Sequence, residues 1–168
     1  KGHSAYMISK LISQYLKTDP QKEIEFHIFD SFEGLSNIKD EDANVKKLEK
    51  NKINLIQKQF ISDEKFVNEK VLKDFNFIKT HKGWIPEKFI EVKNLKFSFV
   101  HIDVDLYDPT LKSLEFFFPR LVNGGIIVCD DYNSLEFDGA KKAWDNFFLD
   151  NKVSFKFVPS LGSSFIIK

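Results

Sequence analysis

The stretch FSFVHIDVDLYDPT, residues 97–110, decides the fold of this chain. It opens with a nearly continuous apolar run, residues 97–102, which is typical of a strand that is buried on both faces. The run ends at Asp103, and Asp108 and Pro109 then begin a helix, with proline at the first helical position. The apolar residues of this helix recur at helical spacing, at Leu111, Leu114 and Phe118. A strand that leads directly into a helix is the repeating unit of a parallel sheet.

The same pattern repeats immediately downstream. Gly124 and Gly125 introduce a second buried run, residues 126–129, which ends in Asp130 and Asp131. Apolar residues then recur at helical spacing and predict a further helix, at Ala140, Ala143, Trp144 and Phe147. Because parallel strands need crossover connections and bury both faces, two consecutive units predict a sheet that is covered by helices on both sides.

The rest of the chain supplies the other elements of an α/β fold. Towards the N-terminus we predict a helix at 4–17 with Ser4 as its N-cap, a strand at 23–29, a helix at 62–73 and a strand at 75–78. Residues 36–59 are rich in Lys, Asn, Asp and Glu, and we interpret them as an insertion. Residues 153–158 and 164–167, joined across 159–162, predict an antiparallel hairpin. We therefore expect a single α/β domain over residues 1–168, with a mostly parallel sheet and a C-terminal hairpin.

Charge and composition bear on partners and compartment. The 25 basic and 25 acidic residues cancel to a formal charge of zero, which indicates neither a nucleic-acid footprint nor a polybasic membrane patch. Cys129 is the single cysteine, so the chain cannot form an internal disulfide. The sequence has neither an apolar run of about 18 residues nor a secretory leader. We expect a cytoplasmic protein without nucleic-acid or membrane partners.

The beginning of the chain is unusual for an α/β domain. It opens with Lys1-Gly2-His3-Ser4, without Met and without a strand, and a helix begins at once. We therefore expect that the domain is N-terminally incomplete and that its first strand lies upstream of residue 1.

Acidic side chains follow both strands of the second half, at Asp103, Asp105, Asp130 and Asp131. Because ligands of open α/β sheets bind beyond the carboxyl ends of the strands, we expect these carboxylates to converge in one crevice. Carboxylates that close raise one another's pKa unless a cation intervenes, and Mg²⁺ takes oxygen ligands at about 2.0–2.1 Å. The cluster predicts a divalent-metal site. The alternative is that Asp105 or Asp131 points to water.

Three features are candidates for binding a cofactor. Asp30 ends a predicted strand, where a carboxylate can accept bonds from both hydroxyls of a ribose, although an Asp before Ser and Gly is also a common turn former. Gly2, at the start of a helix, would let a cofactor approach the backbone. Trp84, directly after Gly83, has a face that can stack on adenine, and a buried packing role fits it as well.

Several stretches of the sequence together resemble the macrocin O-methyltransferase family. They are FHIFDSFEGL (26–35), FISDEKFVNEKVL (60–72), KGWIP (82–86), FVHIDVDLYDPT (99–110), PRLVNGGIIVCDDYN (119–133) and GAKKAWDNFF (139–148). The resemblance therefore runs nearly end to end and is weakest in residues 36–59. The opening residues KGHSA are similar to the end of the family's cofactor loop, an E-x-G-x-x-x-G pattern of which Gly2 matches the final glycine.

The resemblance implies a Rossmann-like, class I methyltransferase fold. It also implies that S-adenosylmethionine methylates a hydroxyl of a sugar or another small natural product, with the help of a divalent metal such as Mg²⁺. By this similarity the metal ligands would be Asp103, Asp130 and Asp131, and Asp103 would also contact the cofactor and accept the proton of the substrate hydroxyl. The other cofactor-binding residues would be Gly2, Asp30, Ser31, Gly83 and Trp84, with Asp30 on the ribose and Gly83-Trp84 beside the adenine. The expected partner is a small-molecule acceptor, and a homo-oligomer is left open.

Three other classes fit parts of the sequence. The D-x-D pattern of residues 103–105 also resembles the nucleophile loop of haloacid dehalogenase-type phosphatases, but Tyr107 and the early Asp130-Asp131 pair depart from that pattern. Metal-dependent glycosyltransferases use a D-x-D pattern to hold a nucleotide diphosphate. The third alternative is a non-catalytic module that keeps the methyltransferase fold without the chemistry.

Overall fold

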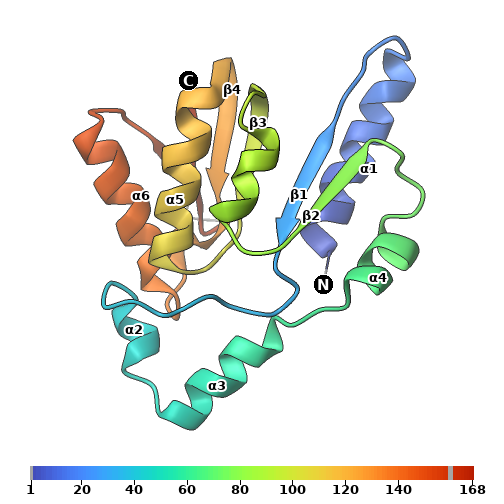
Figure 1. The fold of residues 1–168 in the computed structure, drawn as a ribbon. Coiled ribbons are helices and arrows are strands. Elements are labelled where there is room, and N and C mark those ends of the chain that lie inside the picture. The colour runs from blue at the N-terminus through green and yellow to red at the C-terminus, as the bar shows by residue number, and fades with distance from the viewer. Residues whose placement is uncertain (1, 159–160) are drawn as a thin grey trace.

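The strands form two separate sheets in the computed structural model, which describes residues 2–158 and 161–168. In the first sheet, β1 (Phe26–Asp30) runs parallel to β2 (Ile78–Lys82). In the second sheet, β3 (Phe97–Ile102) runs parallel to β4 (Leu121–Cys129), and β6 (Ser163–Ile167) lies antiparallel to both β4 and β5 (Lys156–Val158). Figure 1 shows β1 and β2 standing apart from β3 and β4.

Helices alternate with these strands along the chain. The α-helices are α1 (His3–Thr18), α2 (Ala43–Lys46), α3 (Lys50–Gln59), α4 (Glu64–Phe66), α5 (Tyr107–Phe117) and α6 (Asp138–Asp150). A π-helical turn, Val67–Val71, continues α4, and 3₁₀ turns cover Glu87–Val92, Phe118–Arg120 and Asp130–Asn133. Residues 36–59, the stretch interpreted as an insertion, thus contain α2 and α3.

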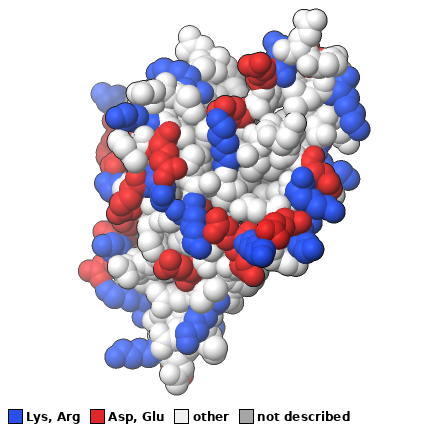
Figure 2. Space-filling model, turned by 45° about the vertical axis from the view of Figure 1, so that its right-hand side comes forward, with Lys and Arg blue, Asp and Glu red and all other residues white. Residues whose placement is uncertain are grey.

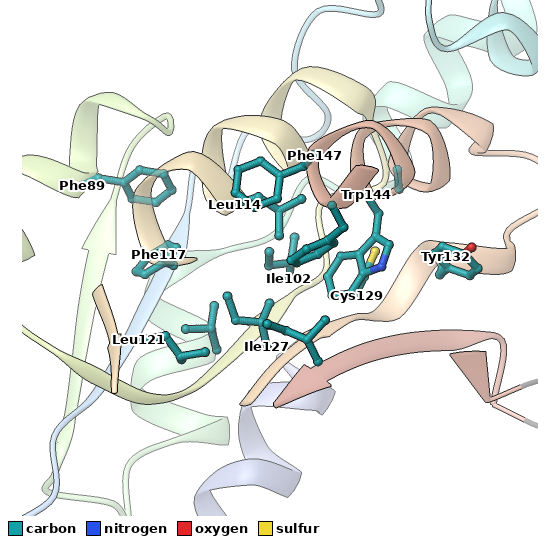
Figure 3. Packing of buried hydrophobic residues seen from close by; sticks show 14 residues of the cluster. Phe89, Ile102, Leu114, Phe117, Leu121, Ile127, Cys129, Tyr132, Trp144 and Phe147 are labelled. Atoms are coloured by element: carbon teal, nitrogen blue, oxygen red, sulfur yellow. The ribbon is translucent and has the colours of Figure 1, made fainter. Parts of the chain in front are cut away.

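The helices cover both faces of the strands. On one face α5 and α6 pack over β3 and β4, and Trp144, Leu114 and Ile127 are fully buried in the core shown in Figure 3. On the other face, α1 and the π-helical turn cover the first sheet, where Tyr6 and Val67 pack with Ile28 of β1. Side chains of this size contribute roughly 1.5–3 kcal/mol each when they are fully buried. The predicted α/β fold, with helices on both faces and a C-terminal antiparallel hairpin, is confirmed.

A cavity of about 290 Å³ lies between the two sheets. Residues of β1, β3 and α1 line it, among them Phe29, Phe99 and Ile8. Within residues 2–158 and 161–168, no strand pairs with the facing edges of β1 and β3.

Local details of the prediction need correction. The strand expected at 75–78 begins only at Ile78, because Phe75 packs edge-on against Tyr6 and belongs to a turn. Ser4 is not the N-cap of α1, because the helix begins one residue earlier and Gly2 takes the cap position. The predicted hairpin is present, but Pro159 and Ser160 in its expected connection lie outside the described residues.

The carboxyl ends of the strands are what position the site. In the first sheet Asp30 pairs with Lys82, and in the second Ile102 pairs with Cys129, so the two strands of each parallel pair end level with one another. Residues that directly follow these ends, such as Gly83 and Asp103, line one pocket. The ends of both sheets therefore face a common space.

The surface carries mixed charge on the face drawn in Figure 2, where basic and acidic side chains intermingle. Among residues 2–158 and 161–168, none of the helices combines the length and the apolar character needed to cross a bilayer.

Candidate active site

Three carboxylates meet at the ends of β3 and β4. Oxygen atoms of Asp103, Asp130 and Asp131 all lie within 4.8 Å of one another. The local reason is the parallel register, which brings the end of β3 beside the end of β4. The structure therefore brings together the three residues that the sequence suggested as metal ligands.

The charges in this cluster are only partly balanced. Burial and the carboxylate of Asp130 raise the pKa of Asp103, and burial and Asp103 raise the pKa of Asp131 to about 6. Asp130 differs, because a hydrogen bond from His101 lowers its pKa. Two of the three carboxylates thus have raised pKa values, as expected for like charges that lie close together and are partly buried.

Asp105 lies beside the cluster, and its backbone N–H contacts one of the three carboxylates. Its N–H donates to Oδ2 of Asp131 at 3.0 Å, and its φ of 60° is unusual for a residue other than glycine. The side chain is buried, with 8% exposed, and burial together with Asp131 raises its pKa to about 8. The alternative that Asp105 points to water is therefore wrong.

Two further residues support the cluster, and the sequence gave no role in the site to the first. The hydroxyl of Ser4, in the first turn of α1, donates to Oδ2 of Asp103 at 3.3 Å. His101 of β3 places its Nε2 3.5 Å from Oδ1 of Asp130. No sequence signal links Ser4 to Asp103, because the two residues are 99 positions apart.

A pocket of about 370 Å³ adjoins the cluster. All the residues suggested as cofactor-binding line it: Gly2, Asp30, Ser31, Gly83, Trp84 and Asp103. Asp105 and Pro109 line the same pocket, as do Leu35, Gln59 and Phe60 beside or within the stretch 36–59. The pocket therefore extends from the end of β1 to the carboxylates after β3.

Asp30 and Ser31 occupy the pocket at the end of β1. Oδ1 of Asp30 accepts the N–H of Phe32 at 2.7 Å, and burial raises the pKa of Asp30. The hydroxyl of Ser31 accepts the N–H of Glu33 and donates to the carbonyl of Gly34, so it is engaged in the turn. The hydrogen bond of Asp30 in this turn uses only Oδ1, whereas the Ser31 hydroxyl is committed to the shape of the loop.

The glycines of the pocket differ in how tightly they are packed. A Cβ on Gly83, whose φ is 134°, would lie 2.7 Å from Cε of Lys88. A Cβ on Gly2, whose φ is 72°, would lie 3.2 Å from Cγ1 of Val67. The side chain of Trp84 is 38% exposed, so it is not the fully buried packing residue that the sequence left open.

Comparison with known proteins identifies the family. The family model described as macrocin O-methyltransferase matches residues 5–158, which is most of the chain. The chain belongs to the macrocin O-methyltransferase family. The resemblance found in the sequence is therefore confirmed.

Solved structures agree with the fold of this methyltransferase family member. The O-methyltransferase NovP matches with a TM-score of 0.73 at 15% identity, and the calicheamicin methyltransferase CalS11 with a TM-score of 0.74 at 17% identity. Each match covers 95% of this chain and 66% of the other protein, so the chain spans just under two thirds of the length of these proteins. No curated protein sequence matches the chain.

Proposed function

We propose that this protein is an S-adenosylmethionine-dependent O-methyltransferase that uses a divalent metal and methylates a hydroxyl of a sugar or another small natural product. The observation that carries the proposal is the position of the Asp103, Asp130 and Asp131 carboxylates beside the pocket that Asp30 and Trp84 line. Membership of the macrocin O-methyltransferase family supports it. One solved structure with the same fold is described as a TDP-rhamnose 3'-O-methyltransferase, which is an example of a sugar acceptor.

The donor set suits a hard divalent cation. Three carboxylate oxygens within 4.8 Å of one another supply the oxygen ligands that Mg²⁺ prefers, and the cluster contains no sulfur ligand. Carboxylates this close repel one another, and a cation between them would relieve that repulsion. When bound there, a divalent cation would supply Lewis acidity that lowers the pKa of an acceptor hydroxyl.

The residues around the cluster would then have different roles in the reaction. Asp103 would accept the proton of the hydroxyl at a carboxylate oxygen, because it lies at the end of β3 and lines the pocket. Ser4 orients Asp103, and His101 orients Asp130. Holding the hydroxyl and the methyl donor in near-attack geometry can lower the barrier by roughly 7–11 kcal/mol, so precise positioning supplies much of the rate.

The pocket supplies the contacts that a nucleoside needs. Asp30 accepts hydrogen bonds from the ribose hydroxyls, as acidic residues at this position do in dinucleotide folds. Trp84 would stack on the adenine, and Gly83 beside it lines the same pocket. Gly2 lets the cofactor approach the start of α1.

Calorimetry tests the cofactor, and transfer of labelled methyl from S-adenosylmethionine to sugar nucleotides and glycosides tests the reaction. We expect S-adenosylhomocysteine to bind, and we expect Asp30→Asn to weaken its binding about tenfold or more, because hydrogen bonds to a charged group contribute about 1.5–3 kcal/mol. Asp74→Asn, which removes an equal charge from an exposed turn, is the matched control. Methyl transfer should stop on chelation and return with Mg²⁺. Failure to bind S-adenosylhomocysteine, or equal activity with and without chelator, would overturn the proposal.

A further inference from the structure

Residues 36–59 contact the β3–α5 loop, residues 103–107, at two points. This loop carries Asp103 and Asp105 and ends at Tyr107, the first residue of α5. One contact is polar and runs through Asp42, and the other is apolar and surrounds Leu106. The stretch that looked like a solvated insertion therefore touches the active-site loop directly.

Asp42 is a buried carboxylate with both oxygens in use. It is 0% exposed, Oδ1 accepts the N–H of Tyr107 at 2.8 Å, and Oδ2 accepts the N–H of Lys39 at 2.8 Å. Burial raises its pKa, and the two N–H groups oppose that shift. A carboxylate that holds one backbone amide on each of two segments ties residues 36–59 to the start of α5.

Gly139 makes room for this contact. A Cβ at residue 139 would lie 1.8 Å from Oδ1 of Asp42 and 2.7 Å from the backbone nitrogen of Tyr107. Both distances are far below van der Waals contact. A side chain at residue 139 would therefore displace the carboxylate, the loop or both.

The apolar contact holds the neighbouring residue of the loop. Leu106 is 0% exposed and belongs to a cluster with Val45, Ile56 and Phe137. Val45 and Ile56 come from α2 and α3, so residues 36–59 supply two of the four buried residues of this small core.

The geometry of the loop explains why such a clamp matters. The N–H of Leu106 donates to the carbonyl of Val104 at 2.6 Å, which closes a tight turn around Asp105 with its positive φ. Within this turn the N–H of Asp105 donates to Asp131. A backbone in a sparsely populated conformation persists only where its surroundings hold it. Release of the Tyr107 end would let the turn relax and move the N–H that orients Asp131.

We infer that Asp42 is a positioning residue of the active site, which fixes the β3–α5 loop and thereby the oxygens of Asp103 and Asp131. Residues 36–59 then help to hold the β3–α5 loop, and with it the site carboxylates, in position. The catalytic consequence rests on the proposed function, whereas the structural consequence does not.

Amide hydrogen exchange on the full chain tests the structural consequence. Asn at residue 42 keeps one acceptor oxygen and turns an NH₂ group towards the other amide, so Asp42→Asn should speed exchange at residues 105–107 about tenfold or more. Gly139→Ala should have the same effect from the other side of the contact. Asp138→Asn is the comparison variant, because Asp138 also accepts a backbone N–H of the stretch, from Asn44 at 3.0 Å, and the hydrogen bonds of its side chain go to Asn44 and Lys142.

Titration with Mg²⁺ and methyl-transfer kinetics test the catalytic consequence. We expect Asp42→Asn to weaken Mg²⁺ binding and to lower kcat about tenfold to a hundredfold, since a misplacement of about 1 Å can cost a hundredfold. Binding of S-adenosylhomocysteine should weaken less than Mg²⁺ binding, because Asp30 and Trp84 lie on other elements, although Asp103 and Asp105 of the loop also line the pocket.

The outcomes separate the two proposals. Unchanged exchange at residues 105–107 in Asp42→Asn, or a kcat and Mg²⁺ affinity equal to those of Asp138→Asn, would overturn the positioning role. If the unaltered protein methylates no acceptor, the proposed function fails, and exchange and Mg²⁺ titration still decide the role of Asp42. Asp42→Asn and Gly139→Ala change the two sides of the same contact. If one of these variants does not fold, the other still tests the positioning role.

Discussion

Oδ2 of Asp131 accepts the backbone N–H of Asp105 at 3.0 Å. A carboxylate from the end of β4 thus holds the loop that follows β3, in addition to lying beside Asp103 and Asp130. The side chain of Asp131 therefore has two possible roles: it stabilises the loop through a hydrogen bond, and it is a candidate metal ligand. Changes at Asp131 should separate these two roles.

Without Mg²⁺, the Asp131→Asn variant should be more stable than the unaltered protein. With Mg²⁺, the variant should be less stable than the unaltered protein. The amide oxygen can still accept the N–H of Asp105, but the charge that burial and Asp103 disfavour is gone. For a chain of this size a gain of 1 kcal/mol raises Tm by about 2–4 °C, which thermal unfolding at neutral pH can resolve.

Added Mg²⁺ should raise the Tm of the unaltered protein clearly and that of Asp131→Asn little, and turnover should be lost. Asp74→Asn controls for the loss of one negative charge at an exposed position. An equal response of both variants to Mg²⁺ would count against a metal at this cluster.

Trp84→Ala should weaken the binding of S-adenosylhomocysteine about tenfold or more, because stacking of a base on an aromatic side chain contributes about 1–3 kcal/mol. Trp84→Phe keeps an aromatic face and should lose less. Trp84 is 38% exposed and lines the pocket, so neither change should lower the stability of the fold much. Calorimetry measures the affinity, and thermal unfolding measures the stability of the fold. A loss of unfolding free energy as large as the loss of binding free energy would indicate that Trp84 acts through packing.

The sequence predicted the active-site carboxylates because they depend on regular structure. Asp103 and Asp130 each end an apolar run, and parallel strands place such ends side by side. The same logic predicted Asp30, which ends β1 and lines the pocket, whereas the role of Gly83, which follows β2, was suggested by the family resemblance.

The parts that the sequence could not predict depend on contacts between distant residues. Asp42 lies in a polar stretch without a strong pattern, and its partner Tyr107 is 65 positions away. Ser4 carries the ordinary signal of an N-cap, yet its hydroxyl bonds Asp103. In residues 75–78 the apolar run was mistaken for a strand, because Phe75 is half-buried by packing against Tyr6 of α1 and not by a sheet.

Gly83→Ala should destabilise the fold and also weaken cofactor binding. At a φ of 134° any side chain is strained, and a Cβ would meet Lys88 at 2.7 Å. Strain of this kind costs about 1–3 kcal/mol, so Tm should fall by several degrees. Gly124→Ala is a useful comparison, because Gly124 also has a positive φ, of 77°. A Cβ on Gly124 would meet nothing within 4 Å, and Gly124 does not line the pocket. A loss of affinity in Gly124→Ala equal to that in Gly83→Ala would contradict a local effect.

The first sheet contains a pair of histidines that should make its stability depend on pH. Nδ1 of His27 lies 2.8 Å from Nε2 of His81, and the outer nitrogens of the two rings contact Glu25 and Glu91. Burial lowers the pKa of His27 below 6.5. Lys79 and Lys88 bond the two glutamates and lower their pKa values, so both glutamates stay ionised above pH 5.

The sign of the effect follows from the lowered pKa of His27. Burial favours the neutral ring of His27 in the folded protein, whereas the unfolded chain protonates this ring more readily. The contribution of His27 to stability is therefore complete above its ordinary pKa of 6.5 and is lost as the pH falls through the lowered value. Thermal unfolding between pH 7 and pH 5 should show a steeper decline for the unaltered protein than for His27→Gln. His3→Gln, at an exposed histidine of α1, should keep the unaltered profile, and a His27→Gln profile with the original slope would contradict the assignment.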